Sequence, residues 1–149
     1  MKRYARRLRC AAMISLAMSF PVLAQVTVKD AWVRATVPAQ SVTGAFMQIT
    51  SRQDTRLVAV ESAAAGITEI HEMSMEKEVM KMRARPDGVA LPAGKSVEFK
   101  PGGYHLMLMD LKQVMKEGDS VQLTLVIEDK NKKRSLVEVK AVVKALASP

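Results

Sequence analysis

The clearest strand pattern of the chain is VQLTLVIEDKNKKRSLVEVKAVV, residues 121–143. Every second residue of its first half is apolar, at Val121, Leu123, Leu125 and Ile127. The second half alternates in the same way, at Val137, Val139, Ala141 and Val143. Because alternate side chains of a strand point to one face, each half has one apolar face. With the polar segment 129–134 between them, the halves predict a β-hairpin whose tip lies in water.

The rest of the chain repeats this pattern of short runs between turn signals, without long segments of helical spacing. Proline and glycine mark turns at Arg85-Pro86-Asp87-Gly88, Pro92-Ala93-Gly94 and Pro101-Gly102-Gly103. We therefore predict an all-β domain, an antiparallel meander, with one helical turn at most, near 114–117. The expected strands are Val26 to Ala35, Ser41 to Ile49, Leu57 to Ser62, Ile67 to Met75, Val79 to Arg85, Ser96 to Phe99, His105 to Leu111, Val121 to Glu128 and Ser135 to Val143.

Residues 1–24 have the layout of a secretory signal peptide: five basic residues, an apolar run over 11–23 and a small residue, Ala24, at the end. The run is shorter than the roughly 20 residues that cross a bilayer, so we expect no stable membrane insertion. A lipoprotein would need a cysteine after the run, and Cys10 precedes it. We expect cleavage after Ala24 and a single domain over residues 25–149.

Removal of this leader changes the composition that matters for function. Five of the 23 basic residues leave with it, so that 18 face 15 acidic residues and the net charge falls from +8 to +3. That modest charge removes the main argument for a nucleic-acid partner. Cys10 also leaves, and a domain without cysteine has no disulfide, thiolate ligand or cysteine nucleophile.

The methionines and histidines of the mature chain gather in a few segments. Seven of its eight methionines and both histidines lie among residues 71–82 and 105–115: His71, Met73, Met75, Met80, Met82, His105, Met107, Met109 and Met115. On strands, residues two apart share a face, so three expected strands each present sulfur or imidazole on one face.

Thioether sulfur and neutral imidazole suit Cu(I), a soft ion, whereas hard cations prefer oxygen ligands. In an oxidising compartment methionine holds Cu(I) without forming crosslinks. Neutral ligands should also bind less tightly than thiolates, which favours release to an acceptor. The alternative interpretation is that the methionines are flexible core fillers, as alternating methionines on strands commonly are.

Four motifs of this sequence resemble those of the PCu(A)C family of periplasmic copper chaperones: His71-Glu72-Met73-Ser74-Met75, Val79-Met80-Lys81-Met82-Arg83, Leu91-Pro92-Ala93-Gly94 and Lys100-Pro101-Gly102-Gly103-Tyr104-His105-Leu106-Met107-Leu108-Met109. The resemblance runs from about Ala31 to the final hairpin and implies a cupredoxin-like Greek-key β-sandwich. It also implies one Cu(I) ion held by His71, Met82, His105 and Met107. Met80 shares the face of Met82 and is the alternative ligand.

The resemblance implies a periplasmic copper chaperone that supplies copper to the copper site of cytochrome c oxidase or to another copper carrier.

 The protein is expected to act as a monomer. Copper buffering or tolerance in the periplasm is the alternative, because ligand identity does not separate storage from delivery.

Other functional classes lack the residues they need. A blue-copper electron carrier requires a cysteine thiolate, which residues 25–149 do not contain. No Ser-His-Asp spacing or carboxylate pair suggests an enzyme. A β-sandwich that binds no metal is the remaining class, and it predicts that copper changes nothing.

Overall fold

The computed structural model describes residues 25–145, and this part of the chain forms ten β-strands and no helix. The strands are β1 (Val26–Arg34), β2 (Val42–Ser51), β3 (Thr55–Glu61), β4 (Ala65–Glu76), β5 (Val79–Ala84), β6 (Val89–Leu91), β7 (Ser96–Phe99), β8 (Tyr104–Leu111), β9 (Ser120–Asp129) and β10 (Arg134–Lys144). Over these residues, then, no helix exists that could cross a membrane. The predicted signal peptide, residues 1–24, lies outside the described residues.

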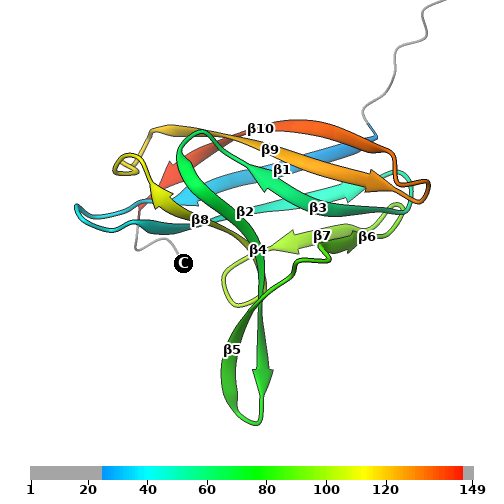
Figure 1. The fold of residues 1–149 in the computed structure, drawn as a ribbon, viewed down its shortest axis with the longest axis horizontal. Coiled ribbons are helices and arrows are strands. Elements are labelled where there is room, and N and C mark those ends of the chain that lie inside the picture. The colour runs from blue at the N-terminus through cyan, green and yellow to red at the C-terminus, as the bar shows by residue number, and fades with distance from the viewer. Residues whose placement is uncertain (1–24, 146–149) are drawn as a thin grey trace, which may run out of the picture.

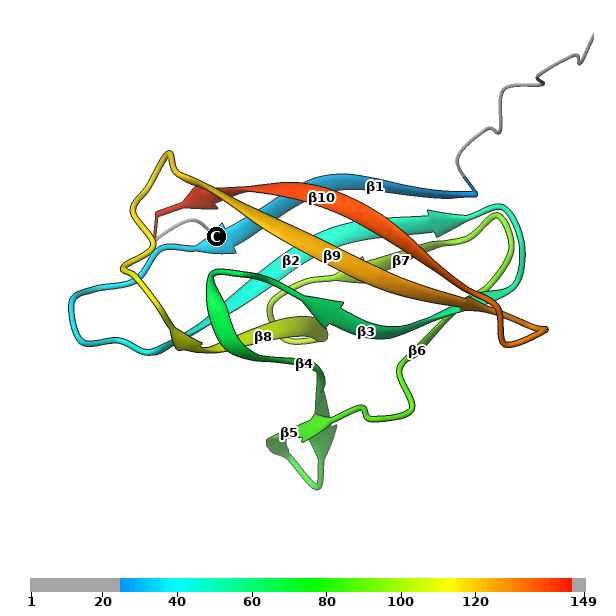
Figure 2. The same cartoon turned by 45° about the horizontal axis from the view of Figure 1, so that its top comes forward.

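The strands form one curled sheet with the order β5-β4-β8-β7-β2-β1-β10-β9-β3-β6 (Figure 1). Its ends meet where β3 and β4 lie side by side, and the Thr68 hydroxyl donates a hydrogen bond to the Val60 carbonyl across this seam. The curled sheet thereby makes the two layers of a β-sandwich, as the turned view in Figure 2 shows.

The predicted meander is wrong, because several neighbours in the sheet are distant in sequence. β1 pairs with β10 in parallel, β4 pairs with β8, and β3 pairs with β9. The sequence pattern predicts the β9–β10 hairpin, but turn chemistry carries no information on these crossings. Partner choice depends on which apolar faces must close over one core.

The hairpin of β9 and β10 is confirmed, and its apolar faces line the core. Val121, Leu123, Leu125 and Ile127 are buried, as are Val139, Ala141 and Val143, while Val137 is half-buried. Asp129 closes the tip, where its backbone N–H donates to the Lys133 carbonyl.

The local structure differs from the sequence-based expectation in two places. The helical turn near 114–117 is absent: Met115 is buried, and its backbone exchanges hydrogen bonds with Thr36, whose hydroxyl accepts from the Met115 N–H. Tertiary pairing has replaced a local helical bond. Strand β6 was not expected, because it is only three residues long, but Val89 and Leu91 are buried and pair with β3.

The β4–β5 hairpin projects out of the sandwich in both views (Figures 1 and 2). Every residue of β5 is exposed, and among the ten described strands β5 pairs only with β4, at the end of the sheet. Lys77 and Glu78 form its two-residue turn, with φ of 49° and 66°. Positive φ at both positions matches the tight hairpin turn that follows the natural twist of two strands.

Candidate metal centre

The two histidines stand directly opposite each other on neighbouring strands. His71 of β4 pairs with His105 of β8, and the two ring centroids are 5.8 Å apart with the rings tilted by 58°. Opposite residues of an antiparallel pair share a face of the sheet. The neighbours Ile70 and Leu106 point into the core, so both imidazoles lie on the outer face.

His105 is held by the turn that precedes its strand. The ring is 6% exposed, and its Nδ1–H donates to the Gly103 carbonyl over 3.1 Å. That bond fixes the tautomer and leaves Nε2 with a free lone pair, to which no hydrogen bond from residues 25–145 is made. Burial lowers the pKa of His105 from its ordinary value, and nearby His71 and Arg34 lower it further, against the effect of the Gly103 carbonyl. The ring is therefore neutral at neutral pH, as a metal ligand must be.

His71 is held by a carboxylate instead. Its Nε2 lies 2.7 Å from Oε2 of Glu69, and since a carboxylate only accepts, Nε2–H is the donor. The other ring nitrogen, Nδ1, is buried and has no hydrogen-bond partner among residues 25–145. A buried polar atom without a partner is costly, and a soft metal ion would satisfy it.

The tight turn at residues 100–103 ties the histidines to the projecting hairpin. Pro101 and Gly102 occupy its two central positions, Gly102 has φ of 83°, and the Gly103 N–H donates to the Lys100 carbonyl over 3.0 Å. The Gly103 carbonyl accepts from the backbone N–H of Met73 over 3.0 Å as well as from His105. One carbonyl thus fixes both the imidazole of β8 and the path of β4.

Met107 lies on the same face as His105, two residues along β8, with Gly44 of β2 opposite it. A hollow of about 280 Å³ opens here, and its lining includes Met73, His105 and Met107. Phe46 forms another part of the wall, with its ring centroid 6.4 Å from that of His105. Two thioethers and an imidazole therefore meet in one partly apolar depression.

Met82 lies on the hairpin rather than in the hollow. It stands opposite Met73 in the β4–β5 register, while Ala84 stands opposite His71, so Met82 is the diagonal neighbour of His71. Met80 stands opposite Met75, one step further out. Register therefore brings Met82 closer to His71 than Met80, although the Met82 side chain is 52% exposed.

Two methionines lie elsewhere than the sequence pattern indicates. Met73 was not among the expected ligands, and Met115 was grouped with the clustered methionines. Met73 lines the hollow with His105 and Met107, and its signal was the His-x-Met spacing from His71, which matches that of His105 and Met107. Met115 belongs to the hydrophobic core at 1% exposure, as Met47 does at 2%. The core-filler interpretation is right for these two methionines.

Harder ligand sets are not available in the described part of the chain. No group of three or more histidine, cysteine, aspartate or glutamate side chains is arranged there to hold a metal ion. The chemistry of the donor set is therefore imidazole and thioether, which suits a soft ion.

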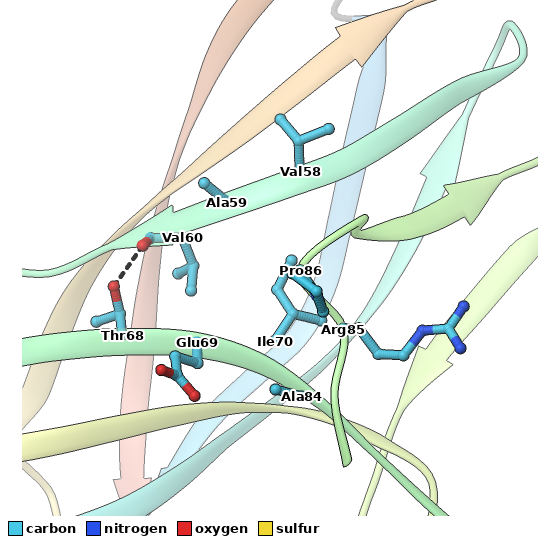
Figure 3. Close-up of a pocket in the computed structure, with 9 residues that line it drawn as sticks. All are labelled: Val58, Ala59, Val60, Thr68, Glu69, Ile70, Ala84, Arg85 and Pro86. Carbon is cyan, nitrogen blue, oxygen red and sulfur yellow. Dashed lines mark hydrogen bonds between the residues drawn. The ribbon is translucent and has the colours of Figure 1, made fainter.

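A second hollow lies at the seam between β3 and β4 (Figure 3). Most of its lining is apolar, and the Arg85 side chain extends away from the other residues drawn. Glu69 belongs to this lining and also accepts a hydrogen bond from His71. The carboxylate that orients the His71 imidazole therefore lies beside the seam.

The chain resembles known proteins over most of its described length. A family model described as "Putative lipoprotein LpqE-like" matches residues 26–142. The putative lipoprotein Lxx21020 of Leifsonia xyli subsp. xyli is 32% identical over 117 residues, which are 77% of this chain and 69% of that protein.

Two solved structures share the fold. The apo PCuAC domain from PmoF1 has a TM-score of 0.65 at 24% identity and covers 82% of this chain and 95% of its own. The solution structure of CuI-DR1885 from Deinococcus radiodurans has a TM-score of 0.57 at 30% identity, with 86% of this chain and 81% of that chain covered. The likeness confirms the expected cupredoxin-like β-sandwich.

Proposed function

The chain belongs to the LpqE-like family of PCuAC copper chaperones, and from this premise we propose that it binds one Cu(I) ion through His71, Met82, His105 and Met107 and passes it to an acceptor protein. A copper chaperone is not an enzyme class. The relative whose structure is named as its Cu(I) form, CuI-DR1885, supports the choice of ion.

One observation carries the proposal. Two imidazoles face each other at 5.8 Å, each with one nitrogen committed to a protein acceptor and the other free. The free atoms are Nδ1 of His71 and Nε2 of His105. Two lone pairs presented on one face, beside the Met107 thioether, suit a soft d¹⁰ ion.

All four proposed donors are neutral when they bind. The bound ion therefore keeps its positive charge, because no carboxylate or thiolate ligand offsets it. A thiolate-rich acceptor would bind the ion more tightly and draw it away. These properties fit delivery, and the copper site of cytochrome c oxidase or another copper carrier is the acceptor class we propose.

The proposal includes export. The leader-like sequence of residues 1–24 and the lipoprotein description of the family both support a location outside the cytoplasm, in the periplasm. The mature protein would then span residues 25–149 and act as a monomer.

Anaerobic titration with Cu(I) against a chromophoric chelator tests the site. We expect one equivalent to bind, with a large loss of affinity in His105→Ala and a smaller loss in Met107→Leu. Met109→Leu is the matched control, because Met109 lies on the same face of β8 but pairs with Ile67, away from the histidines. A chain that takes no stoichiometric copper would refute the metal site.

Periplasmic copper buffering is the second candidate, because the same ligands serve both roles. Transfer to an apo oxidase copper domain separates the two. Delivery predicts that the loaded protein transfers copper faster than an equal concentration of buffered free Cu(I) and that His71→Ala abolishes this advantage. Equal rates would leave buffering.

A further inference from the structure

We infer a second, weaker Cu(I) site at Met75 and Met80, the outer pair of a thioether ladder on the β4–β5 hairpin whose inner pair is Met73 and Met82. The inference rests on the proposed function, because it describes how Cu(I) reaches or leaves the histidine site. Met75 stands opposite Met80, and Met73 stands opposite Met82, so the ladder consists of two facing pairs on one side of the hairpin. Side chains opposite each other on antiparallel strands have Cβ atoms about 5 Å apart, a separation that two flexible thioethers can close around one ion.

Core packing does not explain these side chains. Met75, Met80 and Met82 are 64%, 42% and 52% exposed, on a hairpin that projects from the body (Figure 1). Met47 and Met115, the methionines that do fill the core, are at most 2% exposed. Exposed apolar side chains grouped on one surface commonly mark a binding site.

The opposite face of the hairpin carries its charges. Glu76 accepts from Lys81 at 3.0 Å and from Arg83 at 2.5 Å, and Glu72 pairs with Arg85 at 3.2 Å. These pairs span β4 and β5 or the segment that follows β5. The hairpin therefore has an ionic face that supports its shape and a sulfur face that is free to bind.

The ladder leads into the histidine site. Residues two apart along a strand are about 7 Å apart, so the outer pair, the inner pair and His71 follow one another at that interval. Met73 of the inner pair lines the same hollow as His105 and Met107. Because the outer pair offers only two thioethers and no imidazole, it binds Cu(I) more weakly than the histidine site does. Transfer between the sites is ligand exchange: thioether ligands are replaced by imidazole and thioether ligands, the ion stays Cu(I), and no electron moves.

Methionine methyl NMR on the exported protein, titrated anaerobically with Cu(I), tests the ladder. In wild type, the first equivalent should shift the Met107 methyl resonance, and further Cu(I) should shift those of Met75 and Met80. In His105→Ala, with the tight site removed, the Met75 and Met80 shifts should persist. Met75→Leu/Met80→Leu keeps the apolar surface but removes the sulfur, so it should transfer copper to a chelator several-fold more slowly while the affinity of the first site stays within about twofold.

Val79→Leu is the control, since it alters the apolar surface of the same hairpin without changing a thioether. Its transfer rate should equal that of wild type. The ladder is overturned if wild type binds one Cu(I) but excess copper leaves the chemical shifts of the Met75 and Met80 methyl groups unchanged, and the double variant transfers copper at the wild-type rate. In that case the proposed function still stands. If wild type binds no Cu(I), the proposed function itself is refuted.

Discussion

Replacement of Glu69 by alanine should weaken Cu(I) binding without removing any ligand. The carboxylate holds Nε2–H of His71 at 2.7 Å and so keeps Nδ1 as the free nitrogen. Without it, the imidazole can rotate or exchange tautomers, and the energy needed to restore the binding form is lost from the affinity. Removal of such a supporting group typically costs 10- to 100-fold in metal affinity.

The structure places Glu69→Ala at the low end of that range. The Glu69 side chain is 45% exposed, so solvent screens its interaction with the imidazole. We expect about a tenfold loss, which corresponds to about 1.4 kcal/mol. In Glu69→Gln the amide oxygen still accepts from Nε2–H, so this variant should retain most of the affinity.

Chelator competition measures the loss, and ¹⁵N chemical shifts of the His71 ring report the tautomer. Glu72→Ala is the matched control: it removes a glutamate from the opposite face of the same strand, where its partner is Arg85. It should leave both readouts unchanged. Wild-type copper affinity in Glu69→Ala, with Nε2 of His71 still protonated, would refute the role of the carboxylate.

Three further outcomes follow from the same structure. Met115→Ala should lower the free energy of unfolding by about 2–5 kcal/mol, because Met115 is buried, whereas Met75→Ala at 64% exposure should change it by less than about 0.5 kcal/mol; chemical denaturation of the two variants checks this. Glu78→Gly should stabilise the hairpin by about 1 kcal/mol, because Glu78 has φ of 66°, and slower amide exchange in β5 would show it. The pKa of His105 is lowered in the fold, so the unfolded chain takes up its proton first and the metal-free protein should lose stability as pH falls below 6.5; His105→Gln should show a weaker dependence between pH 7.5 and 5.5 in denaturation curves.

The sequence predicts the faces of the strands better than their partners. Alternation puts His71 with Met73, and His105 with Met107, on single faces, and the structure agrees. That β4 pairs with β8 so that His71 meets His105 is a non-local contact, which local pattern does not encode. The two imidazoles become one site only through that register.

The sequence also does not show which hydrogen bonds leave Nδ1 of His71 and Nε2 of His105 without a partner among residues 25–145. Glu69 lies two residues before His71, and Gly103 lies two residues before His105, so each acceptor shares its histidine's neighbourhood in sequence. Many carboxylates and carbonyls lie as close along the chain, however, and only the ring orientation shows which one accepts. Spacing gives candidates, whereas side-chain packing decides among them.

The candidate site joins a nearly buried part to an exposed one, and this contrast bears on how copper could leave. His71 and His105 lie on paired strands over the core and are nearly buried. The His71 side chain is 12% exposed, and the whole His105 residue is 6% exposed. Met82 lies on a strand with one partner and is half-exposed. Ordering an exposed side chain costs entropy, so in the proposed site we expect the Met82 thioether to be the first donor that an acceptor displaces. The imidazoles would then hold the ion until the acceptor supplies its own ligands.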